Sequence, residues 1–295
     1  MSISSIGRDL IGGITRRLGV DGAEPTRAKT ETASGTAPAP AARAQVPGWD
    51  GRDSFEASRT TATATPEPGG ATRPDLAQIQ RDFQTADDSV VSWSPKAGGL
   101  IPIPFAPEYD VTATEGRMLD GLAASNGLLG LNTFNNIKDQ ALETSSRLYP
   151  TTGTPPGHVP EERVGEWRGQ DGHRDAFRHA YWNALMTREF GAEWTQQFAT
   201  AHEGMPGNPA DREAMDLYNN QVGRQIALDN PNASPEELAT LVQQAVTDGK
   251  MVLFDQRGQL QWSDRVPVNQ HGLSNLVPGT GGQPVPGGDV YADPY

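Results

Sequence analysis

The feature that most constrains the fold of this chain is the segment 173–190, which is apolar almost all the way round a predicted helix. At helical spacing, Phe177 and Tyr181 lie on one side of that helix. Trp182 and Met186 lie on another side. A helix with apolar residues on every side must be buried by other elements. We therefore predict a helical domain with this segment at its centre.

The same helix carries a carboxylate and an imidazole inside its apolar surface. Asp175 and His179 are one turn apart and share a side with Trp182. Burial of such groups without partners costs on the order of several kcal/mol, so we expect other polar residues to meet them. The nearest candidates along the chain are the pair His202-Glu203 and the residue Asp216.

Further helices and one hairpin are predicted on both sides of the central helix. The expected helices are 115–124, 131–148, 192–201, 211–229 and 234–247. The last opens with Ser234-Pro235-Glu236-Glu237, a capping box with proline at the first helical position. Strands at 251–254 and 260–262 form a hairpin. The prolines in 100–105 predict an extended segment along the core. The fold class is mainly α, a helical domain over 92–264 with a small C-terminal β-hairpin.

Both ends of the chain differ in composition from this domain. With 33 Gly and 24 Pro in 295 residues, the chain is too loop-rich to be one compact fold throughout. We predict a disordered linker at 21–91 and a Pro/Gly-rich tail at 265–295. Residues 1–20 repeat apolar side chains at helical spacing, which predicts an amphipathic export or docking helix, or a terminal helix without a role. A continuous apolar core typical of a Sec signal peptide is missing.

Composition also excludes several classes of function. The chain has no cysteine, which excludes disulfides, thiolate metal sites and a cysteine nucleophile. A formal net charge of -13 argues against a nucleic-acid partner, because phosphate contacts need clustered Lys and Arg. No run of about 18 apolar residues occurs, so we expect no transmembrane helix.

Two chemistries fit the polar clusters, and their spacing does not distinguish between them. In the first, a divalent ion such as zinc, calcium or magnesium lowers the pKa of a bound water. The predicted ligands are Asp216 and His173, together with His179, His202, Glu203 and Asp175. In the second, a histidine is the general base for water. The predicted catalytic residues are His179, Asp175, His202 and Glu203.

Other side chains complete either site. The predicted substrate-binding residues are Arg178, Asn183, Asn219 and Asn220, which supply charge and hydrogen bonds to an oxyanion. Gly223 lets another backbone or a ligand come close to the last predicted cluster. The alternative is a buried polar network that locks the helices together and has no catalytic role.

Three ordered motifs carry a resemblance to a known type of domain. They are Asp175-Ala176-Phe177-Arg178-His179, then Ala201-His202-Glu203, then Asp216-Leu217-Tyr218-Asn219-Asn220. Together they resemble an uncharacterised helical domain of bacterial secreted toxins and effectors. A helix with a histidine base beside an aromatic residue is also similar to secreted phospholipase A2, although Ala180 stands where that family has a metal-binding Asp.

The resemblance implies an exported bacterial protein. From the clustered histidines and acidic residues and the N-terminal segment, we predict an effector that hydrolyses a membrane-lipid or other cell-envelope bond. Phospholipid is the first predicted substrate and peptidoglycan the second. The expected partners are a non-Sec secretion apparatus or chaperone, which would bind the N-terminus, and a cognate immunity protein, with action in or on a target cell. The alternative is a non-catalytic effector that binds a host or rival-cell protein. In a catalytic domain, His179, His202 and Asp216 should converge on one open cleft.

Overall fold

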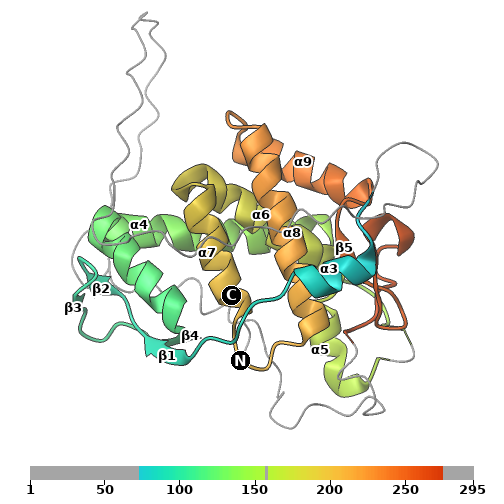
Figure 1. Cartoon of the computed structure of the whole chain (residues 1–295), viewed down its shortest axis with the longest axis horizontal. Coiled ribbons are helices and arrows are strands. Elements are labelled where there is room, and N and C mark those ends of the chain that lie inside the picture. Colours follow the sequence, from blue (N-terminus) through green and yellow to red (C-terminus); the bar gives the residue numbers. More distant parts are fainter. Residues whose placement is uncertain (1–72, 157–158, 275–295) are drawn as a thin grey trace, which may run out of the picture.

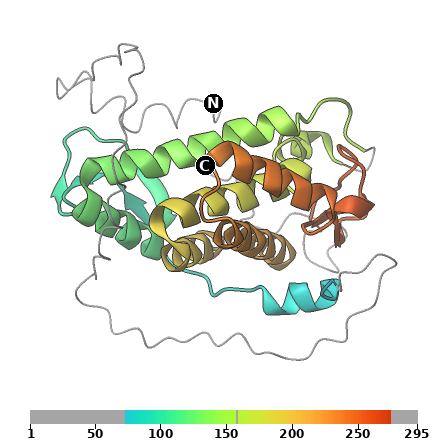
Figure 2. The same cartoon turned by 90° about the horizontal axis from the view of Figure 1, so that it is seen from above.

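The predicted central helix, α6 (His173–Phe190), packs against four others in a computed structural model that describes residues 73–156 and 159–274. Its neighbours are α4 (Ala113–Leu148), α7 (Ala192–Glu203), α8 (Ala210–Asp229) and α9 (Pro235–Thr247). Figures 1 and 2 show α6 in the middle of this group. The prediction of a helical domain around 173–190 is confirmed. Among the described residues, none of the helices is long and apolar enough for a membrane span.

Short elements complete the fold. The small helices are α3 (Leu76–Asp82) and α5 (Val164–Trp167), with 3₁₀ turns at Glu161–Arg163 and Ser263–Arg265. Within residues 73–156 and 159–274, three antiparallel two-stranded sheets pair β1 (Val90–Trp93) with β4 (Tyr109–Thr112), β2 (Lys96–Ala97) with β3 (Ile101–Pro102), and β5 (Val252–Phe254) with β6 (Leu260–Trp262). In the last pair Val252 faces Trp262, which confirms the predicted C-terminal hairpin.

The main core contains a group of aromatic side chains around the C-terminal half of α6. The Phe134 and Phe198 rings lie 4.9 Å apart, and Trp182 meets Phe198 edge-on at 6.0 Å. Trp194 stacks on Phe198 at 5.1 Å. A second core forms where the β5–β6 hairpin packs against Ile79 and α8. The aromatic residues beside His179 in sequence therefore contribute mainly to the helix packing.

Two helices in the described part of the chain begin with a capping box. At α9, Ser234 Oγ accepts a hydrogen bond from the Glu237 backbone N–H, while Glu237 accepts one from Ser234, as predicted. At α4, Thr112 and Glu115 form the same pair. The predicted helices 115–124 and 131–148 are joined in α4, where Gly127 makes a kink with φ of 64°.

The folded part extends beyond both predicted boundaries, 92 and 264. On the N-terminal side, α3 lies inside the predicted linker, and its Ile79 is 1% exposed against the hairpin. Arg73 also donates two hydrogen bonds to Asp264. On the C-terminal side, His271 stacks on Trp167 with ring centroids 5.0 Å apart. Residues 1–72 and 275–295, with the predicted export helix and most of both tails, lie outside the described residues.

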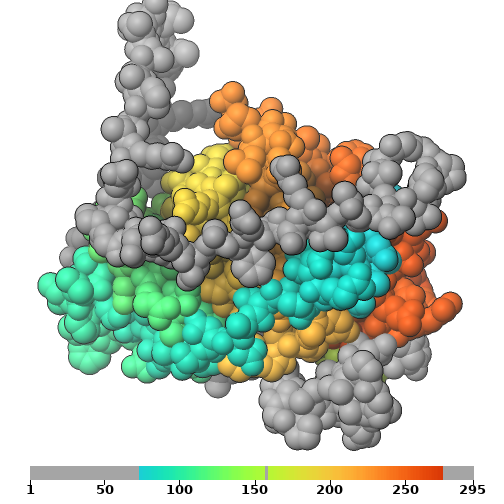
Figure 3. Space-filling model, viewed as in Figure 1, coloured from blue at the N-terminus to red at the C-terminus, as the bar shows by residue number. Residues whose placement is uncertain are grey.

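The segment between α3 and β1 crosses the face formed by α7 and α8 (Figure 3). The Gln84 side chain donates to the Ala210 carbonyl at 2.7 Å, and the Asp88 N–H donates to the Gly204 carbonyl at 2.7 Å. The segment 100–105, predicted to lie along the core, is exposed instead. Leu100 is 84% exposed and Phe105 is 90% exposed.

Candidate functional site

Helices α6, α7 and α8 bring four ionisable side chains together in the interior. We name Asp175, His179, Glu203 and Asp216 the acid–histidine cluster. His179 Nε2 lies 3.4 Å from Asp175 Oδ1 and 3.6 Å from Asp216 Oδ1. His179 Nδ1 lies 3.6 Å from Glu203 Oε1. All four residues are buried, between 1% and 4% exposed.

A glycine makes this convergence possible. A Cβ atom added to Gly223 of α8 would lie 2.0 Å from the Ala180 carbonyl oxygen of α6. Only glycine therefore permits the two backbones to cross this closely. Because Asp216 is two turns before Gly223, the crossing holds its carboxylate beside His179. The predicted close approach at Gly223 is confirmed, with a backbone as the neighbour.

Arg178 neutralises one carboxylate of the cluster. Its Nη2 donates to Asp175 Oδ1 at 2.5 Å and lies 3.0 Å from His179 Nε2. The other Asp175 oxygen accepts from the Asp171 backbone N–H at 2.7 Å. Burial raises the pKa of Asp175, but the charges and hydrogen bonds of Arg178 and His179 outweigh burial and lower it overall. Asp175 is therefore a carboxylate at neutral pH.

The pKa of Asp216 is shifted in the opposite direction from that of Asp175. Burial raises its pKa well above the ordinary value, and the nearby charges of Glu203 and Asp175 raise it further. Among the described residues, Asp216 Oδ1 and His179 Nδ1 have no hydrogen-bond partner. Asp216 therefore holds its proton to a higher pH than an ordinary aspartate does.

A chain of amide hydrogen bonds extends from the cluster along the α6–α8 contact. Asn220 donates to Glu203 Oε1 at 3.3 Å and accepts from Asn183 Nδ2 at 2.6 Å. Arg224, to which we assigned no role from the sequence, donates to Asn183 Oδ1 at 2.9 Å. Burial lowers the pKa of Arg224 to about 10. Asn183 and Asn220 therefore orient Glu203 and bind each other in this structure.

His202 forms a separate buried pair. Its Nδ1 lies 2.9 Å from Glu115 Oε1, while the neighbouring Glu203 turns toward His179. Burial lowers the pKa of His202, but the hydrogen bond and charge of Glu115 outweigh it and raise the pKa overall. The ring also meets the Trp182 edge at 5.6 Å. Sequence reasoning missed Glu115, although the spacing of Thr112 and Glu115 is that of a capping box.

Two predicted site residues lie apart from the cluster. His173, predicted as a metal ligand, contacts the Ser263 carbonyl at 2.9 Å and stacks on Tyr149. It is six residues before His179, which is about 240° round a helix of 3.6 residues per turn, so it faces away. Asn219, predicted to bind substrate, instead donates to the Val252 carbonyl and accepts from its N–H.

The cluster contains a set of atoms suited to a metal ion. One atom each from Asp175, His179 and Asp216 lies within 4.8 Å of the other two. Ligand atoms of a tetrahedral zinc site, bound at 2.0–2.2 Å, are about 3.4 Å apart, close to the two distances from His179 Nε2. A ligating histidine usually donates from its other ring nitrogen to a carboxylate, a carbonyl or water, and Glu203 Oε1 lies 3.6 Å from that nitrogen here, just beyond hydrogen-bond distance.

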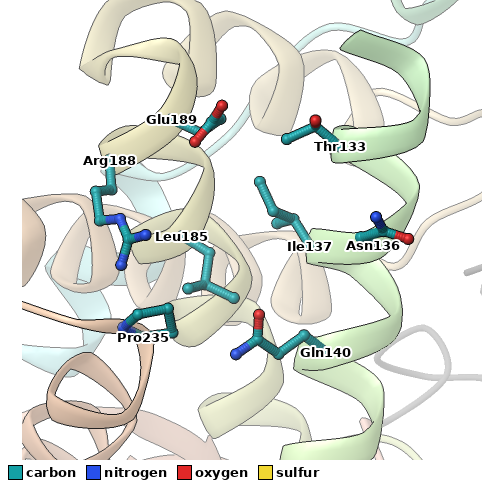
Figure 4. Close-up of a pocket in the computed structure, with 8 residues that line it drawn as sticks. All are labelled: Thr133, Asn136, Ile137, Gln140, Leu185, Arg188, Glu189 and Pro235. Carbon is teal, nitrogen blue, oxygen red and sulfur yellow. The ribbon is translucent and has the colours of Figure 1, made fainter. Parts of the chain in front are cut away.

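A surface pocket lies elsewhere on the molecule, between α4 and α6 (Figure 4). Its lining includes Ile137 and Gln140 from α4 and Leu185 and Arg188 from α6. No residue of the acid–histidine cluster lines it. The predicted convergence of His179 and Asp216 is therefore present, but both side chains are buried and His202 belongs to another pair.

Comparison with known proteins adds a family match for the part of the chain that holds the cluster. No curated protein and no solved structure matches the chain. Residues 124–250, which include all four members of the acid–histidine cluster, match the family described as a domain of unknown function (DUF6973).

Proposed function

We propose that this protein is a hydrolase in which the acid–histidine cluster binds a divalent metal ion. The observation that carries the proposal is the buried set of three carboxyl groups and one imidazole, in which Asp216 Oδ1 and His179 Nδ1 lack hydrogen-bond partners within the part of the chain that the structure describes. Buried charges in proteins are paired or coordinate metals. Burial, with the charges of Glu203 and Asp175, raises the pKa of Asp216, and a divalent cation would favour its ionised form.

Each residue of the cluster has a defined task in this reaction. Asp175, His179 and Asp216 would hold the ion, and the ion would lower the pKa of a bound water into the neutral range. Glu203 Oε1 lies 3.6 Å from His179 Nδ1, and with the ion bound it would accept a hydrogen bond from that nitrogen and fix the ring with Nε2 toward the other ligands. Asn220 holds Glu203 in turn, through the hydrogen bond from its amide.

The substrate and the setting are proposed from the sequence motifs. We propose an exported bacterial effector that cleaves an ester or phosphoester bond of a membrane lipid, with peptidoglycan as the second substrate class. Its partners would be a secretion apparatus or chaperone and an immunity protein. The acidic balance of the chain, with a net charge of -13, is consistent with a substrate other than nucleic acid.

A second function is favoured by one specific observation, the burial of the whole cluster. Side chains only 1% to 4% exposed, linked through Asn220 and Asn183, are also suited to locking helices together. In that case the protein would be a non-catalytic effector that binds a host or rival-cell protein. Substitution of one residue of this network would then lower the stability of the fold, and any loss of function would follow only from unfolded protein.

The test compares two buried histidines of the same helix. The full chain would be expressed in the cytoplasm and in the periplasm of a test bacterium, and lipids and muropeptides would be profiled. The variants are His179→Gln and, as a matched control outside the cluster, His173→Gln. These residues are 3% and 5% exposed.

We expect His179→Gln to reduce hydrolysis by at least about a hundredfold, the scale of a lost acid–base or metal ligand group, with a near-normal melting temperature. His173→Gln should retain hydrolysis in proportion to its folded fraction. A stable and fully active His179→Gln protein would contradict the proposed function. A loss that only follows the unfolded fraction would favour the packing role.

A further inference from the structure

We propose, on the basis of the metal-dependent function proposed above, that Arg178 competes with the metal ion for the acid–histidine cluster. In the structure described here its guanidinium occupies the cluster, and binding of a divalent cation requires the side chain to move out. Arg178 would thus keep metal out of the cluster until the ion displaces its guanidinium.

The contacts of Arg178 coincide with two of the three metal-ligand atoms. Its Nη2 is 2.5 Å from Asp175 Oδ1 and 3.0 Å from His179 Nε2. Those two atoms are themselves 3.4 Å apart. An ion bound at 2.0–2.2 Å to both Asp175 Oδ1 and His179 Nε2 would lie within about 3.5 Å of the Arg178 Nη2, whichever side of the line between the two ligand atoms it occupied.

The two cations cannot share this position. Arginine stays protonated throughout the accessible pH range, so its charge cannot be removed to admit the ion. In a buried site of low dielectric, repulsion between a divalent and a monovalent cation at such a distance is strong. One of them must therefore leave the cluster.

Arg178 is the member that can move. Its side chain is 11% exposed, compared with 1% for Asp175 and 4% for His179. It is also the longest of these side chains, so its charged end can reach solvent while its stem stays in place. Asp216, whose Oδ1 has no hydrogen-bond partner among the described residues, remains behind as the third ligand.

The first experiment measures metal affinity directly. Full-length wild-type protein, Arg178→Gln and the control Arg174→Gln would be titrated with Zn²⁺ and with Mn²⁺ by calorimetry. Arg174 is on the same helix, but its guanidinium donates to Ser146 Oγ and the Arg168 carbonyl, outside the cluster. Asp216→Asn identifies binding at the cluster, because it removes one charged ligand.

Arg178→Gln should bind at least one of the two ions at least about tenfold more tightly than wild type, because a repelling charge is gone. Arg174→Gln should bind as wild type does. If Arg178→Gln and wild type bind metal with equal affinity, and Asp216→Asn does not bind it, the competition is overturned and the metal site remains. Absence of binding in every protein would overturn the metal part of the proposed function as well.

A second experiment needs no variant and so does not depend on the folding of Arg178→Gln. Wild-type protein would be treated with phenylglyoxal, which modifies accessible arginines, with and without Zn²⁺ or Mn²⁺, and the modified peptides identified by mass spectrometry. Metal should increase the modification of Arg178 severalfold and leave that of Arg174 unchanged. Unchanged or reduced modification of Arg178 in metal-bound protein would overturn the exchange.

Discussion

The crossing of α6 and α8 at Gly223 leads to the sharpest prediction about stability. In Gly223→Ala, the new Cβ atom would lie 2.0 Å from the Ala180 carbonyl oxygen and 2.6 Å from its carbon. An ordinary contact is 3.4 Å or more. Both atoms belong to the backbone of a buried helix, so no flexible side chain can move aside. The two helices must therefore separate locally by more than 1 Å, a distance estimated from the same contacts.

The magnitude follows from two opposing effects. Overpacking of this kind costs typically 1 to 3 kcal/mol and occasionally more, and a backbone clash belongs at about the upper end of that range. Replacement of glycine by alanine inside a helix stabilises the folded protein by about 0.8 to 1 kcal/mol through helix propensity. We expect a net loss of about 2 kcal/mol or more in the free energy of unfolding.

The assay is urea denaturation followed by tryptophan fluorescence. Its matched control is Gly121→Ala in α4, where an added Cβ atom meets nothing within 4 Å. That variant should gain about 0.5 to 1 kcal/mol from helix propensity alone. If Gly223→Ala were as stable as Gly121→Ala, the close crossing of the helices would be refuted. Metal binding should also weaken in Gly223→Ala, because separation of α6 and α8 moves Asp216 away from His179.

Three other predictions can be tested in the same way. Trp182→Ala should destabilise the protein by about 3 to 5 kcal/mol, because it leaves a cavity in the aromatic core; an unchanged urea midpoint would contradict this. Ile79→Ala should cost about 2 to 5 kcal/mol, whereas a neutral effect would show that α3 is not part of the fold. Burial, with the charges of Glu203 and Asp87, raises the pKa of Glu213 to about 7, so folded protein holds a proton that unfolded protein releases near pH 4.5. Stability should therefore fall as pH rises from about 4.5 to about 7, and Glu213→Gln should flatten that slope in melting-temperature measurements; an identical slope would exclude Glu213 as its source.

The fold could be predicted largely from local signals. The α6 segment is apolar all round, and α9 begins with a capping box, so both are encoded in short stretches of sequence. The helix α3 could not be found this way. It has seven residues with one buried side chain, Ile79, so it shows no periodicity and exists because the hairpin packs on it.

The candidate site could be predicted in part for a similar reason. Asp175 and His179 are one turn apart on a helix, which places them together without knowledge of the rest of the fold. The pairing of His202 with Glu115 joins residues far apart in the chain and depends on how α4 packs on α7. His173 is the converse case, because closeness in sequence to His179 does not place it on the same helical face.

The hydrogen bonds of Asn219 have a consequence for association with other chains. A side-chain amide offers an N–H donor and a carbonyl acceptor, as a peptide group does, and here an N–H and the carbonyl oxygen of Asn219 meet the outer edge of β5 at Val252. Two residues further along that edge, Phe254 N–H donates to the Asp171 carbonyl and its own carbonyl accepts from Gly272. The edge of the hairpin is thus already paired at both positions, which blocks it as a template for strand addition and for edge-to-edge aggregation.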